Sequence, residues 1–254
     1  MFFKRAVLSR RAMVDITTFQ GFRTHVSEEM FTVMRQPIID LATEHVLHYE
    51  WLVRFDSSGG LEGILRPAEL SGAIKDLDLS MLARAVLQLN DNADGPGIAI
   101  NLSGASMGEA GFEHALNACL SALTGPPEKL MIELTETWDI RDLEPAAALL
   151  ARLRRRGHPI CLDDVGAGAA SIRYLRAIGA DWLKIDGDFV VAAAEQKRDL
   201  SILKALLSLR ESLGVKFIAE GVETASLLEF VRGLGFDAAQ GYYIGKPELK
   251  SEFS

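Results

Sequence analysis

Two adjacent aspartates, Asp163 and Asp164, follow a short apolar run and precede a loop punctuated by glycines, Gly166-Ala167-Gly168. Two carboxylates side by side at the end of a buried strand repel each other unless a cation lies between them, and a divalent metal ion is the simplest such cation. A helix N-cap followed by a solvated turn would explain the same pair without any chemistry. The metal is favoured because the pattern of an apolar run with a polar end recurs along the chain.

Polar side chains stand in or directly after several other apolar runs. The whole set is Glu50, Asn101, Glu133, Asp163, Asp164, Lys184, Glu220 and Gln240. Carboxylate and amide oxygens are hard ligands, typical of Mg²⁺ or Mn²⁺ and not of zinc. Several carboxylates at one place can hold two such ions, which would clamp the attacking and leaving oxygens of a phosphoryl displacement. A lysine among them would orient a water molecule or offset charge on the phosphate.

The elements that must position these side chains alternate between strands and helices. Strands are predicted at residues 31–40, 46–55, 97–103, 129–136, 159–164, 181–186, 215–223 and 238–243. Helices are predicted from Pro67 onward, where Leu79, Leu82, Ala83, Val86 and Leu87 form one apolar face, and at 112–123, 145–156, 172–178, 200–213 and 227–234. Such alternation indicates a parallel sheet of βα units. About eight strands in a domain of this size predict an α/β fold of the (β/α)₈, TIM-like barrel type, in which the C-terminal strand ends share one mouth.

The first two strands depart from the simple barrel. Only a short turn, residues 42–44, joins them, so they must pair antiparallel as a hairpin. Pro37 favours an edge or irregular strand for the first of them. Residues 1–29 are predicted to be a leading helical segment with Phe19 and Phe22 on one side, and residues 30–250 to be the barrel domain.

Composition limits the possible classes of function. The chain has 254 residues, a net charge of −8 and a pI near 5.2, which disfavours binding to DNA or RNA polymers or to anionic membranes. No run of residues approaches the roughly 18 apolar residues of a membrane span. The two cysteines, Cys119 and Cys161, have no metal-binding spacing and are predicted to be reduced core residues of a cytoplasmic protein.

The motifs carry a family resemblance over nearly the whole chain, from about Met34 to Pro247. In order they are Gln36-Pro37-Ile38, Glu50-Trp51-Leu52-Val53-Arg54, Asn101-Leu102-Ser103, Glu133-Leu134-Thr135-Glu136, Asp163 to Gly168, Lys184-Ile185-Asp186, Ala219-Glu220-Gly221-Val222-Glu223-Thr224 and Gln240-Gly241-Tyr242. The chain resembles the EAL-domain family, which comprises bacterial phosphodiesterases of cyclic di-GMP. The resemblance implies a barrel with an antiparallel first strand that hydrolyses cyclic di-GMP to linear pGpG.

The resemblance also implies roles for individual residues. Glu50, Asn101, Glu133 and Asp163 would hold a first Mg²⁺ or Mn²⁺ ion, with Asp163 and Asp164 serving a second. Lys184 and Glu220 would position and deprotonate the attacking water, with Glu220 as the general base. The substrate would contact Gln36, Arg54, Asp186 and Gln240, although Asp186 and Glu223 could equally be structural partners of Lys184 and the following helix. Glu136 and Glu223 would order the loops. Such domains pair as homodimers near the loop that follows Asp164.

Three departures from the family pattern bear on activity. Trp51 replaces the Ala of the family's name motif, but strand alternation places it on the helix side, away from Glu50. The loop after the aspartates has Val165, Ala167, Ala169 and Ala170 where Phe, Thr, Tyr and Ser are usual, and so lacks hydroxyls that could hold Glu136. Residues 245–247 read Gly-Lys-Pro instead of Ser-Arg-Pro, which would affect a base or phosphate contact.

Other functions remain open on the sequence alone. The loop after Asp164, which lacks the usual hydroxyl groups, is compatible with a module that binds cyclic di-GMP without turnover. A pure protein-interaction domain is a further alternative. A nicotinamide-dependent dehydrogenase is disfavoured, because Gly166-Ala167-Gly168 lacks a third glycine and the two aspartates would repel a pyrophosphate.

Overall fold

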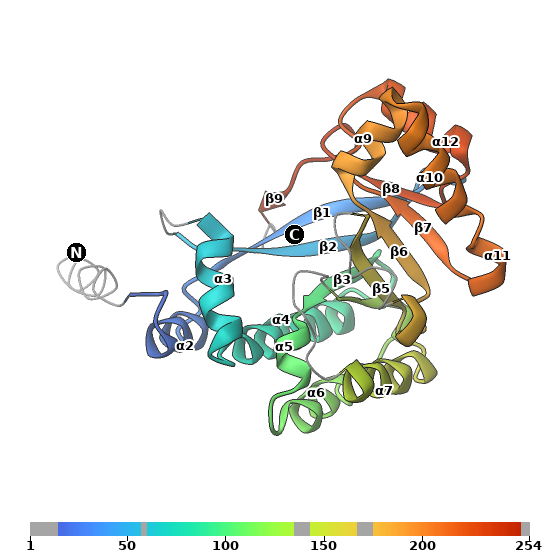
Figure 1. Cartoon of the computed structure of the whole chain (residues 1–254). Helices are drawn as coiled ribbons and strands as arrows, with labels where there is room; N and C mark the ends of the chain where they lie inside the picture. Colours follow the sequence, from blue (N-terminus) through green and yellow to red (C-terminus); the bar gives the residue numbers. More distant parts are fainter. Residues whose placement is uncertain (1–14, 57–59, 135–142, 167–174, 250–254) are drawn as a thin grey trace.

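Eight strands close into a barrel in the computed structural model, which describes residues 15–56, 60–134, 143–166 and 175–249 (Figure 1). The sheet runs in the order β2-β3-β4-β5-β6-β7-β8-β1, and pairing between β1 and β2 closes it. The strands are β1 (Thr32–Asp40), β2 (Val46–Arg54), β3 (Gly97–Leu102), β4 (Leu130–Leu134), β5 (Ile160–Val165), β6 (Trp182–Ile185), β7 (Lys216–Ala219) and β8 (Ala238–Gln240). A short strand, β9 (Glu248–Leu249), adds to β1. The predicted barrel class is confirmed.

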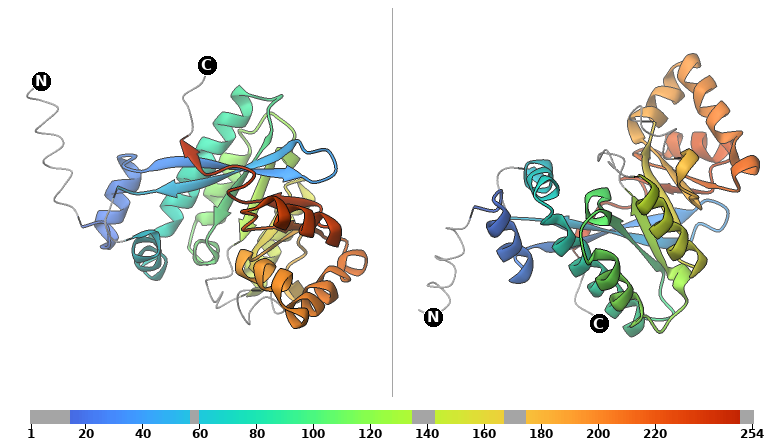
Figure 2. Two further views of the ribbon diagram at one scale, coloured as in Figure 1. Left: turned by 90° about the horizontal axis from the view of Figure 1, so that it is seen from above. Right: turned by 60° about the horizontal axis from the view of Figure 1, so that its bottom comes forward.

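Helices follow the strands and flank the barrel on two sides, with α4 to α7 on one and α9 to α12 on the other (Figure 2). They are α2 (Phe19–Ser27), α3 (Gly60–Leu70), α4 (Ile74–Asp91), α5 (Gly104–Met107), α6 (Phe112–Leu120), α7 (Leu143–Arg155), α9 (Gly187–Glu195), α10 (Lys197–Leu207), α11 (Arg210–Leu213) and α12 (Ala225–Leu234), with a 3₁₀ turn η1 (Pro127–Lys129). Each long helix turns an apolar face toward the sheet, which is the usual way to bury such a face.

Some helix predictions are wrong in detail. The helix predicted from Pro67 begins at Gly60, and α9, α5 and β9 were not predicted. Leu87 is exposed, so it does not belong to the buried face of α4. Phe19 is also exposed, while Phe22 on the same helix is buried and packs its ring 5.9 Å from that of Phe55. The helix predicted at 172–178 lies largely outside the described residues.

The first strand runs against its neighbours. β1 pairs antiparallel with β2 and with β8, whereas all consecutive pairs from β2 to β8 are parallel. The antiparallel hairpin is therefore confirmed, and of the two alternatives for the first strand, edge or irregular, the irregular one is confirmed, since β1 pairs with both β2 and β8. The strand is irregular, because its register with β2 shifts between Ile38 and Ile39. Proline fits here because β8 pairs with Ile38–Asp40 and β9 with Met34 and Arg35, so none of the described strands pairs with Pro37 on that side.

Side chains inside the barrel form two layers, one apolar and one polar. The apolar layer consists of Ile38, Ala99, Met131, Cys161, Trp182, Ile218 and Ala238. Residues of the polar layer lie two positions from these along the chain: Gln36, Asn101, Glu133, Asp163, Lys184, Glu220, which directly follows β7, and Gln240. Glu50 of β2 belongs to the same layer, since it contacts Lys184 and Gln240. Strand side chains on one face repeat every second residue, so the two layers stack along the barrel axis. On β1 the polar residue precedes the apolar one, because this strand is reversed.

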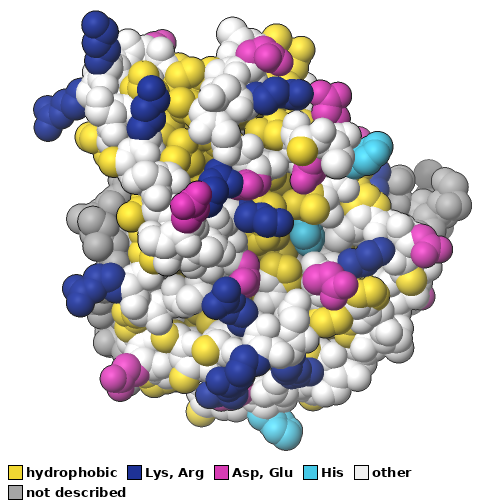
Figure 3. Space-filling view, turned by 90° about the vertical axis from the view of Figure 1, so that its right-hand side faces the viewer, with side chains coloured by type: hydrophobic (Ala, Val, Ile, Leu, Met, Phe, Trp, Pro, Cys, Tyr) yellow, Lys and Arg dark blue, Asp and Glu magenta, His cyan; other side chains and the backbone are white. Residues whose placement is uncertain are grey.

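Side chains that point outward from the strands pack beneath the helices. Trp51, next to Glu50, is 3% exposed and belongs to the outer cluster that includes residues of α3 and α4. The prediction that its bulk lies on the helix side of β2 is confirmed. Among the described residues, none of the helices is long and apolar enough to cross a bilayer. On the face shown in Figure 3, Lys and Arg side chains are scattered among acidic and apolar ones and form no continuous basic stripe.

The end of the barrel opposite the polar layer contains a buried histidine. Burial lowers the pKa of His48 to about 4, against which a hydrogen bond with the Glu128 carbonyl acts only weakly. The His48 ring lies where a Cβ atom at Gly97 would be, so only glycine leaves room for it. In the folded protein His48 is therefore a buried, neutral imidazole at neutral pH.

Protonation of His48 is expected to destabilise the protein at acidic pH. In the unfolded chain His48 takes up a proton below about pH 6.5, whereas in the folded chain it does so only below about pH 4. Stability should fall across this window, by on the order of 3 kcal/mol from this residue. Urea unfolding of wild type, His48→Gln and the exposed control His114→Gln across this range would measure it. A pH profile of His48→Gln identical in shape to the other two would contradict the assignment.

Candidate metal centre

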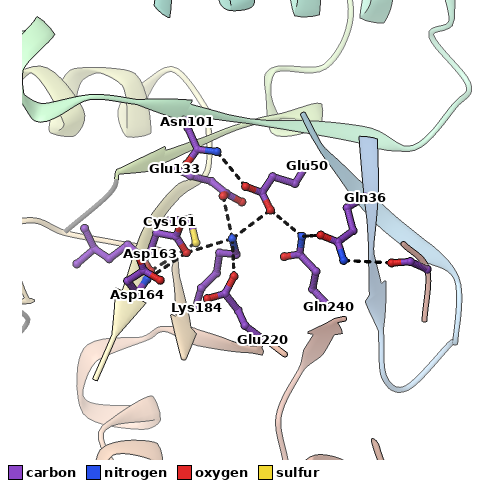
Figure 4. A network of polar contacts seen from close by, with 12 residues as sticks. Gln36, Glu50, Asn101, Glu133, Cys161, Asp163, Asp164, Lys184, Glu220 and Gln240 are labelled. Carbon is purple, nitrogen blue, oxygen red and sulfur yellow. Dashed lines mark hydrogen bonds and ion pairs between the residues drawn. The ribbon is translucent and has the colours of Figure 1, made fainter. Parts of the chain in front are cut away.

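Lys184 lies at the centre of the polar layer, surrounded by four carboxylates (Figure 4). Its Nζ is 2.9 Å from Glu220 Oε1, 3.1 Å from Glu133 Oε2, 3.1 Å from Asp163 Oδ1 and 3.3 Å from Glu50 Oε2. The lysine side chain is 1% exposed, so these pairs are removed from water. Four carboxylates that are far apart in the sequence thus contact one ammonium group. The convergence predicted at the barrel mouth is confirmed for these residues.

Glu50 is held by amide side chains as well as by Lys184. Asn101 Nδ2 donates to Glu50 Oε1 at 2.9 Å, and Gln240 Nε2 donates to Glu50 Oε2 at 2.6 Å. The same Gln240 nitrogen lies 3.2 Å from the oxygen of Gln36. Glu50 is therefore held by amides from two other strands, Asn101 of the neighbouring β3 and Gln240 of β8, which lies beyond β1 in the sheet.

Several oxygens at this centre lack a hydrogen-bond donor. Asn101 Oδ1, Glu133 Oε1 and Gln240 Oε1 are buried and find no partner among the described residues. Buried acceptors without a partner are costly and uncommon. Glu50, Glu133 and Asp163 each offer an oxygen within 4.8 Å of the others, and so do Asp163, Asp164 and Glu220. The oxygen-rich donor set fits metal ions that prefer hard ligands, in two overlapping acidic clusters that share Asp163.

One lysine does not neutralise four buried carboxylates, and their pKa values reflect this. Burial raises the pKa of Glu220 to about 8, and it also raises the pKa values of Glu133 and Asp163 against the attraction of Lys184. Burial acts on Glu50 too, but Lys184 and the amides of Gln240 and Asn101 leave its pKa lowered. Glu50 is therefore the carboxylate that the surroundings keep ionised.

A cavity of about 260 Å³ adjoins the carboxylates. Apolar side chains of α3 and α4, among them Leu65, Leu77 and Met81, form part of its wall, and Glu50, Asn101 and Asp163 form another part. Arg54, Glu69 and Asp78 also line it. A space with apolar walls and a few polar groups beside an acidic cluster is typical of a ligand-binding site.

Asp78 is a buried carboxylate of this cavity that the sequence reasoning missed. Its Oδ2 accepts hydrogen bonds from Ser103 N at 3.0 Å and from Ser106 Oγ at 2.6 Å, which fixes the turn after β3. Burial raises the pKa of Asp78 to about 7. The available signal was a charged residue on the buried face of α4, in line with Ile74 and Leu82.

The remaining predicted site residues occupy less central positions. Asp164 has a φ of 54°, a left-handed conformation that Asp tolerates better than most residues. Asp186 caps α9, where its side chain accepts from Phe189 N at 2.9 Å. Arg54 donates to the Val53 carbonyl at 2.8 Å, and Glu223 is exposed. The predictions for Glu136 and for the loop alanines concern positions outside the described residues, namely Glu136, Ala167, Ala169 and Ala170.

Fold and site together define an eight-stranded α/β barrel with an acidic mouth suited to metal ions. A family model described as the EAL domain matches residues 20–247, and the chain belongs to this family. NbdA of Pseudomonas aeruginosa, a cyclic di-GMP phosphodiesterase, is 30% identical over 256 residues, covering 97% of this chain and 32% of NbdA. PdeB of Shewanella oneidensis, also a cyclic di-GMP phosphodiesterase, is 31% identical over 233 residues, covering 88% of this chain and 27% of PdeB.

The chain spans about a third of the length of these curated relatives. Among solved structures, the PaMucR phosphodiesterase in complex with c-di-GMP is similar, with a TM-score of 0.78 and 29% identity. That similarity covers 91% of this chain and 97% of the PaMucR chain. The antiparallel first strand and the barrel are thus shared with a protein that was solved with its nucleotide bound.

Metal affinity is expected to rise with pH. Glu133, Asp163 and Glu220 have raised pKa values, so protons compete with a metal ion for these carboxylates. Binding should release protons and strengthen between about pH 6 and pH 8. Calorimetry with Mn²⁺ in buffers of different ionisation enthalpy measures both effects. An affinity that is independent of pH, with no proton release, would show that these carboxyls are already ionised.

Removal of the central ammonium group should destabilise the metal-free protein. Lys184→Met leaves the carboxylates of Glu50, Glu133, Asp163 and Glu220 without a counter-charge, which typically costs about 3 to 5 kcal/mol. Mg²⁺ or Mn²⁺ should recover part of this loss, because an ion that binds only the folded chain stabilises it. Thermal unfolding with and without the ion, beside the exposed control Lys204→Met, gives the measurement. Equal stability of the two variants without metal would refute the expectation.

Proposed function

We propose that this chain hydrolyses one phosphodiester bond of cyclic di-GMP to give linear pGpG in a metal-dependent reaction. The observation that carries the proposal is the convergence of Glu50, Glu133, Asp163 and Glu220 on Lys184. Oxygens of Asn101 and Glu133 have no partner in the part of the chain that the structure describes. A site that needed only a stable core would not collect so many uncompensated carboxylates, because each one costs free energy to bury.

The proposed cofactors are two Mg²⁺ or Mn²⁺ ions. Glu50, Asn101, Glu133 and Asp163 would hold the first, and Asp163 and Asp164 the second. Bound there, the ions would polarise the phosphoryl group and stabilise charge on the attacking and leaving oxygens. The two acidic clusters that share Asp163 support this assignment.

The protein side chains would handle the proton and the phosphate. Glu220 would take the proton from the attacking water, whose oxygen forms a bond to phosphorus while one bridging P–O bond breaks. The leaving ribose oxygen ends with a proton, so the products are the linear dinucleotide and no free phosphate. Lys184 would offset the negative charge that builds up on the phosphoryl oxygens. Arg54, at the rim of the cavity, would contact a phosphate group.

The substrate assignment rests on the family and on the cavity. Relatives that are 30% and 31% identical are cyclic di-GMP phosphodiesterases, and the PaMucR structure contains c-di-GMP. The apolar wall formed by Leu65, Leu77 and Met81 suits the face of a purine base attached to a phosphodiester at the carboxylates.

The second candidate function is a receptor that binds cyclic di-GMP without turnover. It is favoured by one feature of the sequence, the replacement of hydroxyl-bearing family residues by Ala167, Ala169 and Ala170 in the loop after Asp164.

We also propose, for either function, a cytoplasmic location and a homodimer that pairs near the loop after Asp164.

Turnover of cyclic di-GMP distinguishes the two functions. Purified protein with Mg²⁺ or Mn²⁺ should form pGpG, and EDTA or Glu50→Ala should lower the rate at least about a hundredfold. The exposed control Glu211→Ala should retain the wild-type rate. Chromatography follows the product, and calorimetry measures nucleotide binding. Tight binding without pGpG would establish the receptor, and the absence of both would overturn both functions.

A further inference from the structure

A chain of amide groups connects Glu50 to the turn after β8. Gln36 Nε2 donates to the Gly245 carbonyl at 3.1 Å, and Gln240 Nε2 donates to Gln36 Oε1 at 3.2 Å. The same nitrogen of Gln240 donates to Glu50 Oε2 at 2.6 Å. Gln36 is 8% exposed and Gln240 is 4% exposed, so this chain runs through the interior of the barrel (Figure 4).

The chain has a fixed direction. A main-chain carbonyl only accepts hydrogen bonds, so the Gly245 oxygen requires the nitrogen end of the Gln36 amide to face it. The oxygen of Gln36 must then face Gln240, and it accepts only from the nitrogen of that residue. This directs the Gln240 nitrogen to Glu50 and leaves Gln240 Oε1 buried without a partner. The orientation of one backbone carbonyl thus sets the orientation of two side chains.

The turn that supplies this carbonyl is itself firmly held. Tyr243 N donates to the Val222 carbonyl at 3.0 Å, and Val222 N donates to the Gln240 carbonyl at 3.1 Å. Gly245 N donates to the Gly241 carbonyl at 3.0 Å. The turn is therefore tied to the segment that follows Glu220, which comes after the neighbouring strand β7.

Glycine at position 245 is what lets the turn approach β1. A Cβ atom there would lie 2.6 Å from Pro37 Cγ, closer than real Cβ contacts allow. A side chain at position 245 would therefore have to displace either the Pro37 ring or the turn that carries the Gly245 carbonyl.

We propose that Gln36 is a positioning residue that acts through Gln240 on Glu50; this rests on the proposed function for the role of Glu50. Both polar atoms of Gln36 have a hydrogen-bond partner within the protein, which is what a positioning role requires. Without Gln36, the Gln240 nitrogen loses one of its two acceptors, and its short hydrogen bond to Glu50 is held in place less firmly. Glu50 would then bind a metal ion less tightly.

The test uses two substitutions at the start of the chain of amides. Gln36→Met removes both polar atoms at similar volume, and Gly245→Ala pushes the carbonyl away from Gln36 without altering any of the amide side chains. Matched controls are the exposed Gln20→Met, and Gly125→Ala, where an added Cβ meets nothing within 4 Å. Circular dichroism and thermal unfolding verify that each variant is folded.

Two readouts separate positioning from substrate contact. Calorimetry without nucleotide should show Mn²⁺ affinity about tenfold weaker in Gln36→Met and in Gly245→Ala, as is usual for partners of metal ligands. For cyclic di-GMP hydrolysis, kcat should fall about tenfold while KM stays within about twofold of wild type. The double variant should be no worse than either single one, because both changes break the same chain.

Three results would overturn the inference. They are a raised KM with unchanged Mn²⁺ affinity, additive losses in the double variant, and the absence of Mn²⁺ binding by the wild-type protein. A wild-type protein that binds Mn²⁺ but forms no pGpG would overturn the proposed hydrolysis alone, because the metal-affinity comparison tests the role of Gln36 without turnover.

Discussion

The ammonium group of Lys184 is the interaction on which the interior of this barrel depends. It lies within 3.3 Å of an oxygen of each of four carboxylates, and its side chain is 1% exposed. Isolated charges are expensive to bury, so the lysine and the carboxylates are stable inside the barrel only together. The closed sheet enforces this arrangement, because strand alternation turns all five side chains toward the axis.

The single charge of Lys184 does not neutralise all four carboxylates, and this makes the centre able to bind further cations. The pKa values of Glu133, Asp163 and Glu220 are raised, while that of Glu50 is lowered by Lys184 and the amides beside it, despite its burial. A cluster in this condition attracts further positive charge. The unpartnered oxygens of Asn101 and Glu133 are suitable ligands for it. The same excess of buried carboxylates thus lowers the stability of the metal-free protein and raises its affinity for a metal ion.

The reversed first strand, β1, brings uncharged residues into contact with the carboxylate centre. Because β1 runs antiparallel between β2 and β8, Gln36 enters the polar layer beside Gln240. The same strand brings Pro37 against Gly245, and the turn after β8 becomes part of the surroundings of Glu50. Trp51, on the opposite face of β2, fills space beneath the helices and leaves the polar layer unchanged.

The sequence by itself determined the strands, the hairpin and the acidic residues at the strand ends, because these depend on local composition and on a period of two. It also indicated the family, through motifs in a fixed order. Only the tertiary structure decided that Lys184 lies among four carboxylates and that Gln36 meets Gly245, 209 residues away. Contacts of this kind depend on closure and register of the barrel, which no local pattern encodes. Asp78 was missed for the same reason, since its partners Ser103 and Ser106 belong to another βα unit.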